Sequence, residues 1–310
     1  MSSPVIATDT DQGPRPSQQD ACSHRVEPAT GGWRAAVADG FGAHPGTREA
    51  AQLAADTATA APGGAADAVL AAARAITRAH PGADCVMAHA RQDSPDEPVD
   101  IAWVGDCRVW TWSPGEGLRQ HTRDHTRGQE MRDLRVSDHL ARSCDHTVTA
   151  SVATAAPGSV GTATAPAADL VLFTCDGIHD HVDERLLAEL VTDHAHDPDV
   201  LVRVLVDAAR EAESTDNATA LVIGLVPDRR TRHRTRQERL LYGMEGFGGP
   251  GDRLPEDSEH LLRVLAEDRT AGIACDRFLL RDGATYWCTK DSDHTDRHVS
   301  WHGVSWSQTY

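Results

Sequence analysis

Four aspartates lie at the ends of segments that are typical of buried β-strands: Asp39, Asp106, Asp176 and Asp216. Three of them have a glycine neighbour, in the pairs Asp39-Gly40, Gly105-Asp106 and Asp176-Gly177. Glycine lets the backbone turn tightly and approach a ligand closely. Carboxylates that converge from strand ends cannot all ionise side by side unless a cation lies among them. Their oxygen donors favour Mg²⁺ or Mn²⁺ over Zn²⁺.

A divalent-ion site at these strand ends is therefore the chemistry that the residues themselves indicate. A single Asp-Gly pair is more often a turn, but a similar arrangement at four strand ends favours a metal site.

The elements that would position these carboxylates are strands and helices in irregular order. Apolar runs predict strands at 33–38, 169–177 and 216–226, and the alternation in 99–113 predicts two strand segments around Gly105-Asp106. Apolar spacing and alanine content predict helices at 47–60, 64–80, 183–194 and 198–212. Residues 126–166 are polar with weak periodicity, which predicts a long, partly mobile insertion. Because strands and helices do not alternate regularly, the pattern favours packed sheets with helices outside.

Composition limits the classes of function. A chain of 310 residues, 40% of them hydrophobic, can form one large domain with an appendage, or two domains. The formal charge of -17 argues against a nucleic-acid partner, and no apolar run approaches the roughly 20 residues that span a bilayer. The N-terminus shows no signal peptide. The cysteines are dispersed, which predicts free thiols in a cytoplasmic protein: Cys22, Cys85, Cys107, Cys144, Cys175, Cys275 and Cys288.

The composition changes after Val226. Residues 227–255 are rich in Arg, Gly and Pro, with six arginines between 229 and 239, and predict a linker. The arginine run would either dock an acidic partner or form a solvated tether, and the tether is the preferred interpretation. Residues 256–310 predict a small C-terminal region of unknown role, with a helix near 256–268 and strand-like stretches at 277–288 and 298–310.

A series of short motifs resembles that of the PPM-type, metal-dependent protein phosphatases, the protein phosphatase 2C family. The motifs occur in the family order: "GPRPSQQDA" (13–21), "VADGFGAH" (37–44), "WVGDCRVW" (103–110), "HTRDHT" (121–126), "LFTCDGI" (172–178) and "DNATALVI" (216–223). The resemblance implies that residues 1–226 form an α+β catalytic domain. This domain would be a four-layer α-β-β-α sandwich of two antiparallel sheets flanked by helices, with the metal site between the sheets at one end.

The resemblance also implies roles for individual residues. Asp39 would bridge two Mn²⁺ or Mg²⁺ ions, Gly40 would offer its carbonyl oxygen, and Asp176 and Asp216 would complete the second ion's shell. Asp20 would hold water in the outer shell, and Asp106 would contribute to a weaker third ion. Arg15 would bind the substrate phosphate, for which the guanidinium fork is suited. His44 would be either a leaving-group acid or a structural loop residue. The substrate would be a phosphorylated protein, with a cognate serine/threonine kinase acting in opposition.

The sequence suggests three alternatives, of which the first remains open and the other two are disfavoured. The first is a catalytically weak scaffold that binds phosphoproteins, because the family's flap element is not evident after His125 and Gln18 replaces a usual Asn. The second is a cysteine phosphatase using Cys107 or Cys175, but neither lies in a glycine-rich loop ending in arginine. The third is a zinc protein, suggested by His179-Asp180-His181 and by the tail residues Cys275, Cys288, His294, His298 and His302, whose spacing matches no zinc finger.

Overall fold

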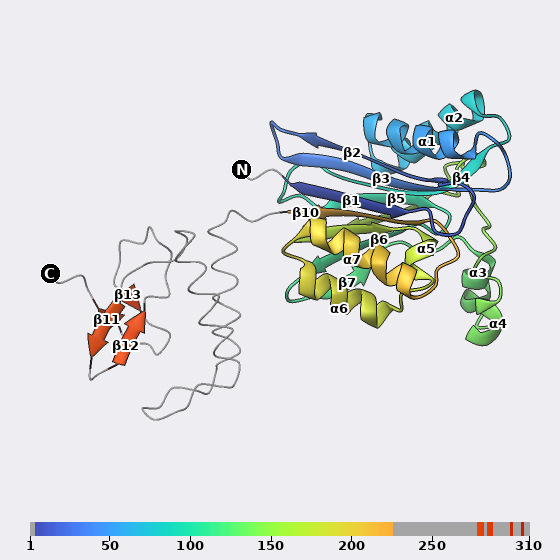
Figure 1. Ribbon diagram of the computed structural model, residues 1–310. Helices are drawn as coiled ribbons and strands as arrows, with labels where there is room; N and C mark the ends of the chain where they lie inside the picture. The colour runs from blue at the N-terminus through green and yellow to red at the C-terminus, as the bar shows by residue number, and fades with distance from the viewer. Residues whose placement is uncertain (1–3, 226–277, 282–283, 288–297, 300–304, 307–310) are drawn as a thin grey trace. The chain divides into compact units, whose positions relative to one another are not determined.

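The computed structural model describes residues 4–225 and, in the remainder, 278–281, 284–287, 298–299 and 305–306. The chain divides into two compact units, Met1–Val226 and Pro227–Tyr310, and each is described by itself (Figure 1). The predicted linker 227–255, its arginine run 229–239 and the predicted helix near 256–268 lie outside the described residues.

One five-stranded antiparallel sheet has the order β2-β3-β4-β5-β8. Its strands are β2 (Asp20–Glu27), β3 (Gly32–Phe41), β4 (Asp84–Gln92), β5 (Val99–Val104) and β8 (Gly161–Ala165). Helices α1 (Thr47–Ala60) and α2 (Ala65–Ala79) cover its outer face. The buried faces of both helices consist mostly of alanine, and these small side chains let the helices lie close to the sheet.

The second five-stranded antiparallel sheet has the order β1-β10-β9-β6-β7. Its strands are β1 (Val5–Asp11), β10 (Ala218–Gly224), β9 (Leu170–Thr174), β6 (Arg108–Ser113) and β7 (Gly117–Gln120). Helices α5 (Asp176–His179), α6 (Glu184–His194) and α7 (Pro198–Glu211) pack on its outer face. Asp183 and Asp197 cap the N-termini of α6 and α7 by accepting backbone hydrogen bonds.

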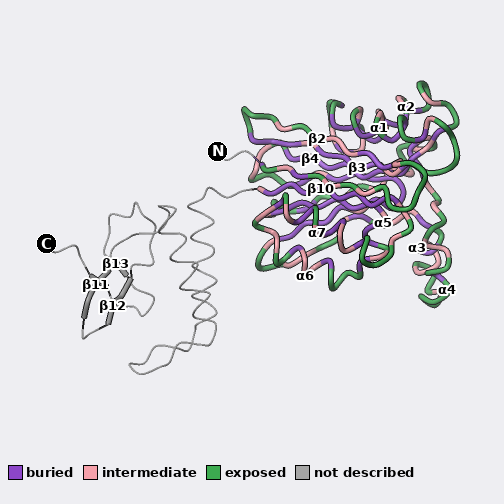
Figure 2. The backbone as a smooth tube through the Cα atoms, viewed as in Figure 1, coloured by how far each residue is buried: buried purple, intermediate pink, exposed green. Residues whose placement is uncertain are grey.

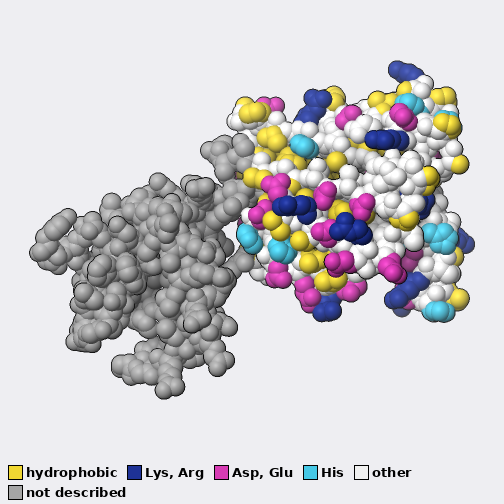
Figure 3. All heavy atoms as spheres, viewed as in Figure 1, with side chains coloured by type: hydrophobic (Ala, Val, Ile, Leu, Met, Phe, Trp, Pro, Cys, Tyr) yellow, Lys and Arg dark blue, Asp and Glu magenta, His cyan; other side chains and the backbone are white. Residues whose placement is uncertain are grey.

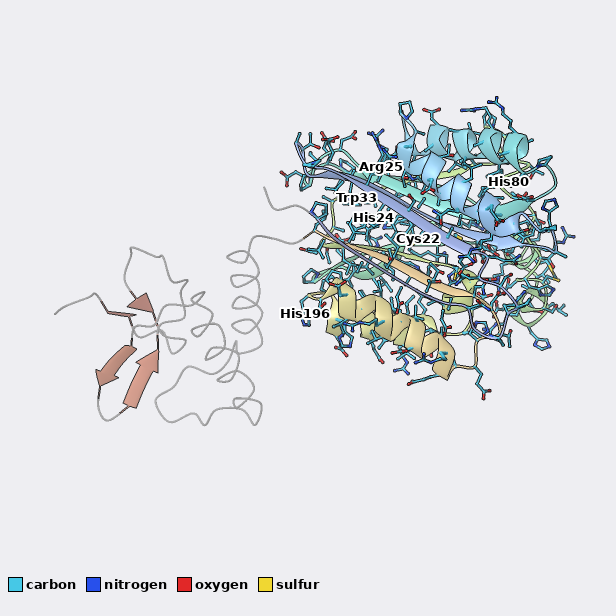
Figure 4. The ribbon with its side chains drawn as sticks, turned by 45° about the horizontal axis from the view of Figure 1, so that its top comes forward. Cys22, His24, Arg25, Trp33, His80 and His196 are labelled. Carbon is cyan, nitrogen blue, oxygen red and sulfur yellow. The ribbon has the colours of Figure 1, made fainter. Side chains whose placement is uncertain are left out.

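Three apolar layers hold the sandwich together. One lies between α1–α2 and the first sheet, one between the two sheets, and one between the second sheet and α5–α7. Trp33 and Phe173 fill the middle layer. Buried backbone follows the strands, and exposed backbone follows the outer sides of the helices (Figure 2). The predicted α-β-β-α sandwich is therefore confirmed. His80 at the end of α2 and His196 between α6 and α7 mark its opposite outer layers (Figure 4).

The segment 126–166, predicted to be a long, partly mobile insertion, contains regular elements that its weak periodicity does not predict. This segment contains α3 (Arg127–Asp133), α4 (Asp138–Arg142) and β8. Arg132 joins the two short helices, because its guanidinium contacts Asp138 at 2.8 Å and Asp145 at 2.6 Å. Ion pairs, together with the Thr126 cap of α3, order these helices more than an apolar stripe does, so hydrophobic periodicity carries little signal for them.

The described part of the C-terminal unit consists of two short antiparallel pairs. β11 (Phe278–Arg281) pairs with β12 (Ala284–Trp287), and β13 (His298–Val299) pairs with β14 (Ser305–Trp306). They fall within the two stretches whose composition predicts strands. In the described residues of the whole chain, no helix has the length and apolar character that crossing a membrane requires.

Candidate active site

Five aspartates form one acidic cluster at an end of the sandwich, and we call it the acidic cluster below: Asp20, Asp39, Asp106, Asp176 and Asp216. The first sheet supplies the first two, from the start of β2 and the end of β3. Asp106 lies in the turn between β5 and β6. Asp176 begins α5 directly after β9, and Asp216 lies just before β10. Segments that are far apart in the sequence, from both sheets, thus place their carboxylates at one location.

Burial and mutual repulsion both act on the pKa values of these carboxylates. The surrounding protein desolvates Asp39 and raises its pKa well above the usual range, and the charges of Asp20, Asp176 and Asp106 raise it further. Desolvation raises the pKa of Asp20 to about 6. The pKa of Asp176 is raised by desolvation and by the charge of Asp216. Neighbouring buried carboxyl groups of this kind do not all ionise at once unless a cation is present.

The donor atoms of the acidic cluster fit a divalent cation in their chemistry. Asp20 Oδ1 and Asp176 Oδ1 are buried and have no hydrogen-bond partner, and a carboxylate oxygen in that condition is costly unless it accepts a proton or binds a cation. In the described residues, no three or more His, Cys, Asp or Glu side chains are arranged so that they could hold a metal ion as they stand. The fit therefore rests on the donor set and on the unpartnered oxygens.

Close backbone packing brings Asp176 and Asp216 together. A Cβ on Gly177 would overlap the backbone carbonyl of Asn217, so only glycine lets α5 begin this close to the start of β10. The Asn217 amide oxygen accepts from Gln19 N at 2.8 Å, and its nitrogen donates to Gln12 O at 2.8 Å. Asn217 thereby ties the loop before β2 to the start of β10.

Arg15 is brought to the edge of the acidic cluster by that loop. Its Nη2 donates to Asp216 Oδ2 at 2.5 Å, and its Nε donates to Thr215 O at 3.0 Å. About half of the side chain is exposed, 49%, so the guanidinium is accessible from solvent. An accessible cation beside a carboxylate cluster can bind an anionic group that approaches the site.

Comparison with known proteins agrees with this geometry. The family model described as "Protein phosphatase 2C" matches residues 49–218, which is more than half of the chain. The chain belongs to the protein phosphatase 2C family. It is a protein serine/threonine phosphatase. The matched range contains Asp106, Asp176 and Asp216 and begins after Asp39. No curated protein matches the chain.

Solved phosphatase structures share the fold. The PPM Ser-Thr phosphatase MsPP from Mycobacterium smegmatis, solved in complex with cacodylate, is 28% identical, with a TM-score of 0.59 over 73% of this chain and 100% of that one. Stp1 from Staphylococcus aureus is 18% identical, with a TM-score of 0.63 over 73% and 96%. The catalytic domain of PstP, solved with two manganese ions, is 22% identical, with a TM-score of 0.61 over 72% and 99%.

His44 of the phosphatase lies in the exposed loop after β3. Its Nδ1 accepts from Gly46 N at 3.0 Å, and its backbone oxygen accepts from Thr47. Within residues 4–225, no hydrogen bond or ion pair joins His44 to the acidic cluster. The Gly46 contact selects the tautomer whose proton is on Nε2. The structure therefore brings together six of the seven predicted site side chains, and His44 is the exception.

Asp180 is a member of this region that the sequence motifs do not single out. Partial desolvation and the charge of Asp176 raise its pKa to about 6. The signal that identifies it is its spacing, because a residue four positions after Asp176 lies one helical turn away. Beside it, Arg108 forms a bidentate pair with Asp124, with contacts of 3.0 and 2.5 Å, which anchors the segment after β7.

The cysteines beside the aspartates do not have the character of nucleophiles. Cys107 and Cys175 are buried, and burial raises the pKa of both thiols well above the usual value. With raised pKa values both thiols stay protonated. Because a thiol must ionise to attack phosphorus, neither can act as the nucleophile. His179, from the histidine pair that suggests zinc, is also buried and bonds Thr174 Oγ1 through Nδ1 at 2.9 Å.

Proposed function

We propose that this phosphatase hydrolyses phosphoserine and phosphothreonine in proteins with the help of divalent ions held by the acidic cluster. The observation that carries the proposal is the meeting of five carboxylates from two sheets, with buried, unpartnered oxygens on Asp20 and Asp176. Similarity to a phosphatase solved with two manganese ions supports the choice of ion. Two ions, Mn²⁺ or Mg²⁺, with a weaker third, would supply an activated water and neutralise charge on the phosphoryl group.

The residues of this chain have distinct roles in the proposal. Asp39, Asp176 and Asp216, with the carbonyl oxygen of Gly40, would hold the two principal ions. Asp106 would serve the weaker third ion. Asp20 would accept a hydrogen bond from water in the outer shell and so orient it.

Substrate binding falls to Arg15 in the proposal. Its guanidinium would donate to two phosphate oxygens, and such a bidentate fork fixes orientation as well as charge. If His44 protonates the leaving oxygen, it does so from Nε2, because Nδ1 accepts from Gly46. We expect a cognate serine/threonine kinase to supply the phosphoprotein substrates.

Hydrolysis of p-nitrophenyl phosphate and of a phosphothreonine peptide, with and without Mn²⁺, tests the proposal. The wild type should turn over both substrates only with metal, and Asp39→Asn should abolish turnover. Asp193→Asn, at an exposed position of α6, is the matched control and should leave the rate unchanged. Absence of metal-dependent turnover in the wild type, with retained binding of the phosphopeptide, would decide for the phosphoprotein-binding scaffold.

A further inference from the structure

A closed ring of hydrogen bonds runs from one carboxyl oxygen of Asp20 back to the backbone N of the same residue. Thr219 Oγ1 donates to Asp20 Oδ2 at 2.7 Å, and the hydroxyls of Thr219 and Thr10 are 2.8 Å apart. Gln18 Nε2 donates to Thr10 Oγ1 at 2.6 Å. The ring closes because Gln18 Oε1 accepts from the backbone N of Asp20 at 2.9 Å.

The proton arrangement in this ring has one consistent direction. A hydroxyl carries a single proton, and Thr219 gives its proton to Asp20. Thr10 must then donate to Thr219, and Thr10 in turn accepts from Gln18. The orientation of the Gln18 amide is fixed as well, because its oxygen must face the N–H donor of Asp20 and its nitrogen then faces the Thr10 hydroxyl. The direction of every hydrogen bond in the ring is therefore determined.

The ring also joins the two sheets. Thr10 and Thr219 are register partners on β1 and β10 of the second sheet, whereas Asp20 begins β2 of the first sheet. Thr219 is only 1% exposed, so its hydrogen bond to Asp20 is shielded from competing water. Its backbone N additionally donates to Cys175 Sγ at 3.0 Å, next to Asp176. Thr219 thus bonds directly to Asp20 and also to Cys175, the residue that precedes Asp176.

We propose that Thr219 is a positioning residue that holds Asp20 through Oδ2 and leaves Oδ1 free to accept a hydrogen bond from water in the outer shell of the cation site. This inference rests on the proposed function, because it gives Asp20 a task only if divalent ions occupy the acidic cluster. Thr10 and Gln18 keep the Thr219 proton directed at Asp20. The replacement of the family's usual Asn by Gln18 then has a structural role, since the Gln18 amide spans from Asp20 N to Thr10 Oγ1.

Thr219→Val tests the ring, because valine keeps the branched shape and removes the hydroxyl. Mn²⁺ affinity of the full chain is measured by isothermal titration calorimetry. We expect binding about 10-fold weaker, at the lower end of the range typical for loss of an outer-shell partner of a metal site. The kcat for p-nitrophenyl phosphate should fall by a similar factor with little change in KM, because Arg15 is untouched. Thr219→Ser, which restores the hydroxyl, should recover most of the affinity.

The matched control is Thr111→Val on β6 of the same sheet. Thr111 is also buried, and its hydroxyl contacts His121 Nε2 at 2.7 Å, outside the acidic cluster. This variant should bind Mn²⁺ with wild-type affinity even if it unfolds at a lower temperature. If Thr219→Val does not fold, Gln18→Met breaks the ring at a less buried position and should weaken Mn²⁺ binding in the same direction.

The outcomes separate this inference from the proposed function. Wild-type Mn²⁺ binding and kcat in a folded Thr219→Val, or failure of Thr219→Ser to recover the affinity, would overturn the positioning role. A wild type that lacks metal-dependent hydrolysis would instead overturn the proposed function. The calorimetric affinities still decide on the ring in that case, because they do not depend on turnover.

Discussion

Asp20 and Asp39 lie directly opposite each other on the antiparallel strands β2 and β3. Side chains in such a pair have Cβ atoms about 4.5–5.5 Å apart, and like charges at this distance destabilise a sheet. The charge of Asp20 is one of the causes that raise the pKa of Asp39. The register of the first sheet therefore maintains a repulsion that a bound cation would relieve, and this is typical of a site that favours function over stability.

The first prediction follows from that opposition. Asp39→Asn removes an ionisable carboxyl group from the acidic cluster while keeping the size of the side chain. The metal-free protein should become more stable by on the order of 1 kcal/mol, whereas metal-dependent hydrolysis should disappear. Urea denaturation in EDTA at pH 7 measures the first effect. Asp193→Asn should change neither quantity, and an Asp39→Asn protein that is both less stable and fully active would contradict the interpretation.

The second prediction concerns the pH dependence of the metal-free protein. The pKa of Asp20 is raised from 3.8 to about 6 in the folded state. An acid whose folded pKa is raised contributes stability below its unfolded pKa and loses it as the pH rises through the folded value. Between about pH 4 and 6, the chelated wild type should therefore lose on the order of 1 kcal/mol per pH unit relative to Asp20→Asn.

Adding Mn²⁺ provides the complementary measurement. Metal binding requires ionised carboxylates, so Mn²⁺ should raise the unfolding temperature at pH 7 and have much less effect near pH 4.5. Equal metal stabilisation at both pH values would indicate that the ions bind outside the acidic cluster.

Hydrophobic patterns and motif order predict the framework of the fold but not all of its parts. β3 and β9 are continuous apolar strands, and α7 buries one face, so each follows from its residues. β4 carries no such pattern because His89 and the partly buried Arg91 interrupt it. The helices α3 and α4 are equally hidden, since Arg132 and its carboxylate partners order them.

Four of the five aspartates can be picked out from the sequence because each adjoins a predicted strand end, whereas Asp20 is predicted only from the family resemblance. What local pattern cannot predict is the contact between distant segments. The bond from Thr219 to Asp20 joins residues 199 positions apart, and the Asn217 contacts depend on the loop that carries Arg15. On the face shown in Figure 3, arginines are mixed with acidic side chains. The net charge of the chain therefore does not indicate which arginine lies at the site.

The third prediction concerns His89, which is fully buried in β4 with no hydrogen-bond partner on either ring nitrogen in the described structure. Burial lowers its pKa from 6.5 to about 3. The folded state therefore holds the neutral ring, and the protein loses stability as the pH falls from 6.5 toward 3, by up to about 1.4 kcal/mol per unit. His89→Met should remove this loss.

The measurement is the difference in unfolding free energy between His89→Met and the wild type at pH 7 and pH 5. The difference should shift in favour of the variant at the lower pH. His24→Met on β2, where the side chain is exposed (Figure 4), is the control and should show a much smaller shift. A pH-independent difference for His89→Met would show that His89 does not titrate in this range.

The fourth prediction concerns the turn that carries Asp106. Gly105 has a φ of 95°, and a Cβ at this position would overlap the side chain of Val86. Gly105→Ala should therefore cost about 1–3 kcal/mol from backbone strain and overpacking, and should also displace Asp106. Gly115→Ala is the control, because nothing lies within 4 Å of its added Cβ. Thermal unfolding compares the two, and equal unfolding temperatures would contradict the strain.

The last prediction concerns Arg15 and the direction of its guanidinium. If Arg15 binds the phosphate, Arg15→Ala should raise KM for a phosphothreonine peptide about 10-fold, since a charged hydrogen bond contributes roughly 1.5–3 kcal/mol. Arg15→Lys should recover part of this loss, because lysine keeps the charge but not the fork. Arg185→Ala, at an exposed ion pair on α6, should leave KM unchanged. Because Arg15 also pairs with Asp216, a role at the metal site is the alternative. An Arg15→Ala protein with unchanged KM and altered Mn²⁺ affinity would mean that Arg15 acts on the metal site rather than on the substrate.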